Sequence, residues 1–130
     1  MGARWSGALV ILALTACSGQ GNAEAENVRS AANRFAATVD TDTGAACGLL
    51  APGTLETFET EEGPCVQELS TAAKGTGGSV ESVEVYGKDA VAYLSSDTLF
   101  LARFPQGWRV TAAGCTKQAN RPYDCAVRGA

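Results

Sequence analysis

The spacing of the apolar residues changes near residue 75, and this change constrains the fold more than any other feature of the chain. Before it, apolar side chains recur at the spacing of one helix face. After the connection Gly75–Gly78 they alternate with polar ones, as in strands with one buried face. Because the two patterns occupy separate parts of the chain, the sequence predicts an α+β domain with helices packed on one side of an antiparallel sheet.

Several segments before residue 75 carry helical signals. The longest has its apolar residues on one face, and Asp42 is placed to cap the next segment with its carboxylate. Pro64 suits the first position of the last segment, since a proline there gives up no helical hydrogen bond. We expect helices over Glu24–Val39, over 45–50 before Pro52-Gly53 stops it, as a turn around Leu55 and Phe58, and over 64–73.

The second part of the chain contains short alternating runs separated by turn residues. Short turns force consecutive strands to lie antiparallel, so the runs predict a four-stranded antiparallel meander. The segment Gly114–Ala130 shows no periodicity and is expected to be an irregular tail. The predicted strands are Val80–Tyr86, Ala90–Leu94, Thr98–Phe104 and Trp108–Ala113.

Residues 1–16 have the features of a removable export signal. Arg4 supplies a positive charge, and an apolar run of about ten residues follows, too short to span a bilayer. The run ends at Leu14-Thr15-Ala16-Cys17, which resembles the lipobox of bacterial lipoproteins. The resemblance implies cleavage before Cys17 and lipidation of its thiol. The alternative is an ordinary cleavage site beside an incidental cysteine.

This interpretation divides the chain into a lipoprotein signal peptide at 1–16, a lipidated Cys17 with a flexible tether at 17–23, and one domain at 24–130. The diacylglyceryl group of lipoproteins anchors more firmly than one acyl chain, because each buried methylene contributes about 0.8 kcal/mol. We therefore expect a domain held by its lipid on the extracytoplasmic face of the cell membrane.

The chain has five cysteines, and assigning Cys17 to lipid leaves an even set of four. In an oxidising compartment four cysteines allow three disulfide pairings. We favour the local one, Cys47 with Cys65 and Cys115 with Cys125, because each pair closes a short connection. A four-thiolate zinc site is disfavoured, since no Cys-x-x-Cys spacing occurs.

Composition excludes several classes of function. The chain has no histidine, which removes Ser-His-Asp and Cys-His catalysis and His-ligated metal sites. Its net charge is −4 and no basic stripe occurs, so we expect no nucleic-acid partner. No cofactor or metal site is predicted: the run Asp40-x-Asp42-x-Gly44 lacks the glycine and glutamate that a calcium-binding loop needs further on.

The order of these elements resembles that of NTF2-like proteins. The resemblance rests on an opening helix with an Ala-x-x-Phe core, on the segment Ala45–Pro52 and on Gly107-Trp108-Arg109-Val110, where the last turn leads into the last predicted strand. It implies a cone formed by a curved sheet and helices, as in small actinobacterial lipoproteins of this layout. Some NTF2-like proteins are isomerases or dehydratases working in the cone, and many are binding or accessory modules.

No catalytic residue can be assigned from this resemblance. A cavity enzyme of this kind needs a carboxylate base and a hydroxyl donor in a dry pocket. The carboxylates at Asp40, Asp42 and Asp97 fall in turns, where they are expected to face water, and Tyr86 and Tyr93 fall in strands. The acidic run Glu56, Glu59, Glu61 and Glu62 is expected to be a solvated helix end.

The aromatic residues leave two interpretations open. Tyr93, Phe100, Phe104 and Trp108 either line a cone cavity that takes a small apolar ligand or belong to the core. We expect a non-catalytic binding or accessory module of the cell envelope, with a protein partner or a small apolar ligand. A cavity enzyme is the alternative.

Overall fold

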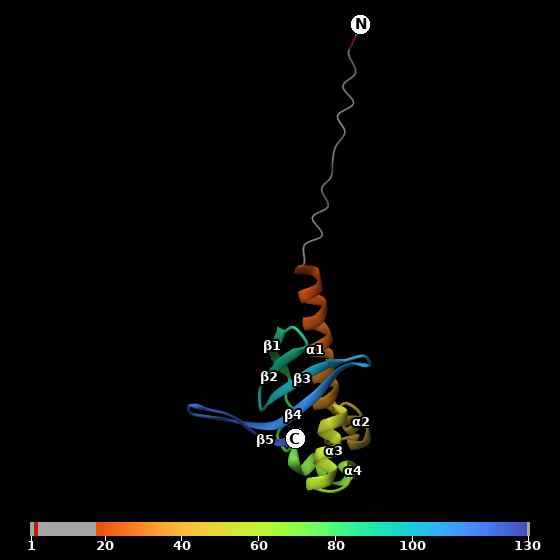
Figure 1. Ribbon diagram of the computed structural model, residues 1–130, viewed down its shortest axis with the longest axis vertical. Coiled ribbons are helices and arrows are strands. Elements are labelled where there is room, and N and C mark those ends of the chain that lie inside the picture. Colours follow the sequence, from red (N-terminus) through yellow and green to blue (C-terminus); the bar gives the residue numbers. More distant parts are fainter. Residues whose placement is uncertain (1, 3–17, 130) are drawn as a thin grey trace.

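The computed structural model describes residue 2 and residues 18–129. Apart from residue 2, the predicted signal peptide lies outside the described residues, and so do the predicted cleavage site and Cys17, the predicted lipidation site. Within them the chain is an α+β domain in which helices are followed by an antiparallel sheet, as predicted (Figure 1).

The helical part has four helices: α1 (Ser18–Thr38), α2 (Thr43–Gly48), α3 (Pro52–Glu61) and α4 (Cys65–Ala72). The predicted Asp42 cap is confirmed, since its carboxylate accepts a hydrogen bond from the Ala45 N–H at 3.3 Å. The expected single turn around Leu55 and Phe58 is a full helix, because Pro52, assigned as a stop, occupies a first-turn position where proline is favourable.

Helix α1 begins earlier than the sequence indicated. Its first described residue is Ser18, so residues 18–22 have a helical backbone in the segment that was predicted to be a flexible tether. Once a helix is nucleated, each further residue adds a hydrogen bond, and the strong helix formers Ala23 to Glu26 allow it to extend towards the N-terminus.

The sheet has five strands, not four. They are β1 (Val80–Tyr86), β2 (Asp89–Leu94), β3 (Thr98–Phe104), β4 (Gly107–Gln118) and β5 (Arg121–Arg128), and each pairs antiparallel with its neighbours in chain order. The expected irregular tail is thus the end of β4 and the whole of β5. The alternation of Tyr123, Cys125 and Val127 was the available signal, but Pro122 before them and Asp124 between them obscured it.

The core fills the space between α1 and the sheet. Phe35 of α1 and Leu99, Leu101 and Val110 of the sheet are completely or almost completely buried. At the far end of α1 the helices α2–α4 gather beside β4 (Figure 1). There, Leu50 forms a parallel bridge with Val110, which attaches the helical part to the sheet.

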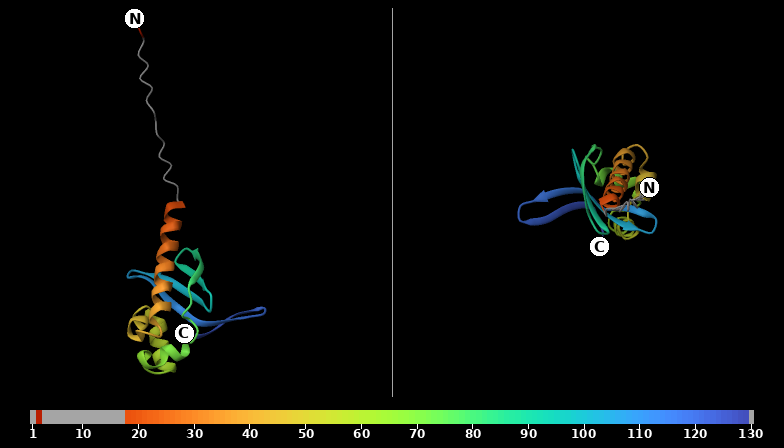
Figure 2. Two further views of the ribbon diagram at one scale, coloured as in Figure 1. Left: turned by 180° about the vertical axis from the view of Figure 1, so that it is seen from behind. Right: turned by 90° about the horizontal axis from the view of Figure 1, so that it is seen from above.

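The predicted disulfide pairing is confirmed. Cys47–Cys65 joins α2 to α4, and Cys115–Cys125 joins residues that lie opposite each other on β4 and β5. Beyond this second bridge the β4–β5 hairpin projects sideways from the body, as both views in Figure 2 show.

Candidate functional site

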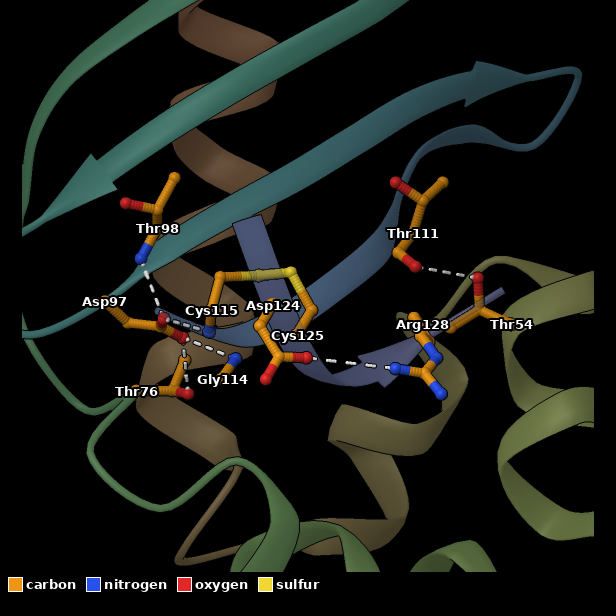
Figure 3. Close-up of a disulfide and its surroundings, with 10 residues drawn as sticks. All are labelled: Thr54, Thr76, Asp97, Thr98, Thr111, Gly114, Cys115, Asp124, Cys125 and Arg128. Carbon is orange, nitrogen blue, oxygen red and sulfur yellow. Dashed lines mark hydrogen bonds and ion pairs between the residues drawn. A yellow bond between two sulfur atoms is a disulfide. The ribbon is translucent and has the colours of Figure 1, made fainter. Parts of the chain in front are cut away.

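Asp97 has a structural role that the sequence did not indicate. Its carboxylate accepts hydrogen bonds from the Thr76 hydroxyl at 2.8 Å and from three backbone N–H groups (Figure 3). These belong to Thr98 at 2.8 Å and to Gly114 and Cys115 at 2.9 Å each. The turn position predicted that Asp97 would face water. The prediction was incomplete, because the carboxylate also accepts these four hydrogen bonds. Asp97 joins the β2–β3 turn to the α4–β1 connection and to β4.

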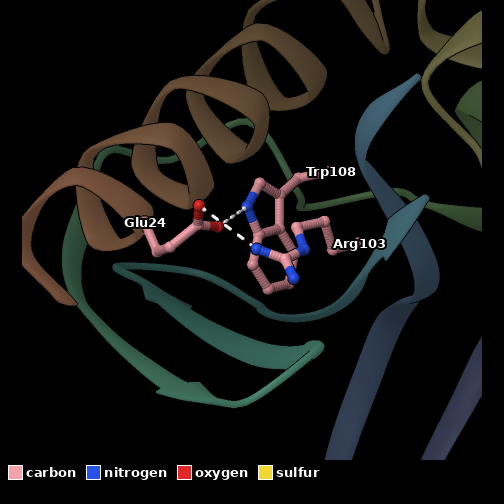
Figure 4. A network of polar contacts seen from close by, with 3 residues as sticks. All are labelled: Glu24, Arg103 and Trp108. Atoms are coloured by element: carbon pink, nitrogen blue, oxygen red, sulfur yellow. Dashed lines mark hydrogen bonds and ion pairs between the residues drawn. The ribbon is translucent and has the colours of Figure 1, made fainter. Parts of the chain in front are cut away.

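The four aromatic residues that were expected to line one cavity do not lie together: Tyr93 and Phe100 lie on one face of the sheet and Trp108 on the other. Phe104, at the end of β3, lines an open groove with Trp108. Trp108 is buried on the side that faces the helices, and its indole N–H donates to Glu24 of α1 at 2.7 Å (Figure 4). Phe100 and Tyr93 lie on the other face, since they alternate with buried neighbours in β3 and β2. Buried side chains fill the space between α1 and the centre of the sheet, so no apolar cavity is assigned there. The groove between α1 and the β3–β4 hairpin is open and lined mainly by charged and polar residues.

The face of the sheet away from the helices carries an aromatic cluster, which we call the aromatic face: Tyr86, Tyr93, Phe100 and Tyr123. Phe100 and Tyr123 meet edge to face with ring centroids 5.3 Å apart. Tyr86 is 60 % exposed, and the others are partly exposed. Tyr123 was missed in the sequence because the tail was not recognised as a strand.

Glu84 organises the β1–β2 end of the aromatic face. Its carboxylate accepts hydrogen bonds from the Tyr86 hydroxyl and, at 3.4 Å, from the Tyr93 hydroxyl. The hydrogen bond to Glu84 raises the pKa of Tyr86 above 10.0. Loss of hydration, followed by the charge of Glu84, raises the pKa of Tyr93. Both hydroxyls act as donors to the Glu84 carboxylate.

The acidic run lies on and just beyond α3, at the opposite end of the domain from the start of α1 (Figure 1). All four glutamates are exposed. Glu59 has a local role, since its carboxylate accepts the Cys65 N–H at 3.1 Å at the start of α4. Over the described part of the chain, no group of three or more His, Cys, Asp or Glu side chains is arranged to hold a metal ion.

No described helix has the length and apolar character required to cross a membrane. No protein-family model, curated protein or solved structure matches the chain.

Proposed function

We propose that this protein is a lipoprotein, anchored through Cys17, whose domain binds a protein partner of the cell envelope on its aromatic face. The observation that carries the proposal is the placement of Tyr86, Tyr93, Phe100 and Tyr123 on the sheet face that the helices leave uncovered. An antiparallel sheet with one solvated face ordinarily carries polar residues there. Aromatic residues are enriched at protein interfaces instead.

The chemistry of this face favours a partner with arginine or lysine at the centre of its own surface. Tyrosine supplies a large, stiff contact area and a polar hydroxyl at its edge. Glu84 adds a carboxylate between Tyr86 and Tyr93, beside Val91 on the neighbouring strand. An arginine can stack on the rings while pairing with this carboxylate.

Anchoring through Cys17 is supported by the lipobox-like sequence Leu14-Thr15-Ala16-Cys17. The described part of α1 follows this residue and packs along the sheet. A domain attached in this way would be displayed beside the membrane without spanning it.

The test of the docking face is photo-crosslinking in membranes of the protein's own cell. A photoreactive residue replaces Val91, which lies between Glu84 and Phe100 in the sheet, and a second version places it at exposed Glu56 on α3 as the control. We expect one discrete heterologous adduct from position 91, none from position 56, and loss of the adduct when Glu84→Lys is added.

Other outcomes of this test overturn the proposal. An adduct with twice the mass of the chain would make the face a dimer interface, and no adduct, or one from both positions, would leave the aromatic face without a specific partner. The anchor is tested separately by mass spectrometry: a mature chain starting at Cys17 with a diacylglyceryl increment is expected, and a free thiol at Cys17 would refute it.

We further propose that the domain is a variant of the NTF2-like fold in which side chains fill the interior of the cone. The support is the order of helices before an antiparallel sheet, with Gly107-Trp108-Arg109-Val110 opening β4. An experimental structure tests this kinship. Superposition of its helices and strands on an NTF2-like protein in the same order is expected, and a different connectivity would reject it.

A further inference from the structure

We propose that the groove between α1 and the β3–β4 hairpin binds a phosphate ester, either a soluble one or the headgroup of a phospholipid. The groove has a volume of about 420 Å³, which lies within the usual range for small-ligand sites. Side chains from two elements far apart in the sequence line it. They include Glu24, Arg34, Arg103, Trp108 and Arg109.

The charges in this groove are unbalanced in favour of an anion. Arg34, Arg103 and Arg109 line it, and Glu24 is the one carboxylate among its lining residues. Both oxygens of Glu24 are engaged: one accepts the Trp108 indole N–H at 2.7 Å, and the other lies 3.4 Å from an Arg103 nitrogen (Figure 4). One carboxylate therefore offsets one of three guanidinium groups.

The other two arginines have no carboxylate partner among the described residues. Arg34 has no acidic residue three or four positions away on α1, and Arg109 faces Ala102 across the sheet. The guanidinium of Arg109 donates to the Trp108 carbonyl at 3.0 Å, which leaves further N–H groups for a ligand. Asn27, Ser30 and Gln106 also line the groove and add polar groups that can bind an ester oxygen.

Phosphate is the anion that this arrangement fits best. Guanidinium groups bind phosphate oxygens in pairs, and several can share one phosphate because it presents more oxygens than a carboxylate. The groove runs along α1 from Glu24 to Arg34, which lie about 9 Å and about 24 Å along the helix from Ser18. If Cys17 is lipidated, a headgroup can enter the groove where the groove faces the bilayer, whereas binding of a soluble ester does not depend on the anchor or on the aromatic face.

Trp108 provides the readout. The chain has two tryptophans, and Trp5→Phe leaves Trp108, in the wall of the groove, as the one fluorescent indole. The full chain in a non-ionic detergent is titrated with glycerol 1-phosphate, with glycerol as the uncharged control. We expect saturable change in Trp108 emission with the phosphate ester and none with glycerol.

Matched variants distinguish the groove from general charge attraction. Arg34→Gln with Arg109→Gln should weaken binding at least about tenfold, since charge-assisted hydrogen bonds are lost. Lys117→Gln with Arg121→Gln removes the same charge near the tip of the β4–β5 hairpin and should leave the affinity unchanged. Equal weakening by both pairs, or no saturable signal, would overturn the proposal. Circular dichroism confirms that each variant is folded.

Reconstitution separates the two sources of phosphate. The same Trp5→Phe chain is placed in phosphatidylcholine vesicles with and without phosphatidylglycerol. If phosphatidylglycerol changes Trp108 emission and weakens the response to glycerol 1-phosphate, the ligand is the lipid headgroup. If it does neither and glycerol 1-phosphate still binds, the ligand is a soluble ester. Either result supports the groove as a phosphate-binding site. Neither result depends on the outcome of the crosslinking at position 91, which tests the aromatic face.

Discussion

The carboxylate of Asp97, in the β2–β3 turn, lies 2.9 Å from the backbone nitrogen of Cys115 on β4. The same carboxylate also accepts a hydrogen bond from Thr76, which is completely buried. One side chain thus holds together a turn, a loop and the strand that carries the second disulfide. Because Thr76 is buried, leaving its hydroxyl without this acceptor would lower the stability of the fold.

Replacing Asp97 should therefore destabilise the domain. We expect Asp97→Ala to lower the free energy of unfolding by about 2–4 kcal/mol, because Thr76 and two N–H groups of β4 lose their acceptor. Asp89→Ala, at an exposed position with no side-chain hydrogen bond among the described residues, is the control and should change little. Urea denaturation measures both. Equal effects would contradict the role assigned to Asp97.

Removing Glu24 should weaken the attachment of α1 to the sheet. In Glu24→Ala the nearly buried indole of Trp108 loses its acceptor, and we expect a cost of about 1–3 kcal/mol. Glu26→Ala removes the same charge from an exposed position on the same helix and serves as the control. Denaturation followed by Trp108 emission in the Trp5→Phe background gives the comparison. A stability loss no greater than that of the control would show that this hydrogen bond is not important.

Alanine variants of Gly87 and Gly114 should separate the cost of backbone strain from the cost of close packing. Gly87 and Gly114 both have φ of 63°, so alanine at either position is strained by about 1–2 kcal/mol. At Gly114 an added Cβ would also lie 2.9 Å from the carbonyl oxygen of Ala72, whereas nothing lies within 4 Å at Gly87. Thermal denaturation should show that Gly114→Ala is clearly less stable than Gly87→Ala. Similar values would mean that β4 does not pack closely on the end of α4.

The two disulfides should contribute differently to stability. Cys47 and Cys65 are separated by 18 residues and Cys115 and Cys125 by 10, so chain entropy predicts about 3 kcal/mol for the first bridge and slightly less for the second. The Cys115–Cys125 bridge links β4 and β5, which are already held by strand pairing. The Cys47–Cys65 bridge joins two helices, α2 and α4. Paired Cys→Ala variants measured by urea denaturation should show the larger loss for Cys47–Cys65. Mass spectrometry of the native chain should show a gain of four hydrogen atoms on reduction of both bridges.

The stability of the domain should fall at alkaline pH. The folded-state pKa of Tyr86 and of Tyr93 lies above 10.0, the ordinary value, so the unfolded chain loses these protons first as the pH rises. The stabilisation is complete below pH 10.0 and is lost as the pH rises through the folded-state pKa values. Glu84→Gln should shift the phenolate absorbance titration to lower pH, and Glu81→Gln should not. No difference between these variants would contradict the proposed pairing of Glu84 with the tyrosines.

The sequence by itself determined the features that depend on neighbouring residues. The change of apolar period separated helices from strands, Asp42 was recognised as a cap, and the short separations of the cysteines indicated the local disulfide pairing. Caps and periodicities are visible in sequence because they depend on contacts within a few residues of each other.

Only the tertiary structure decided which residues meet across the sheet. Thr76 and Asp97 are 21 residues apart, and Glu24 and Trp108 are 84 apart, so neither pair leaves a local pattern. Strand alternation places Phe100 and Trp108 on opposite faces, and β5 completes the aromatic face with Tyr123. The register of strands and the packing of helices set these contacts, because a shift of one residue moves every side chain of a strand to the other face.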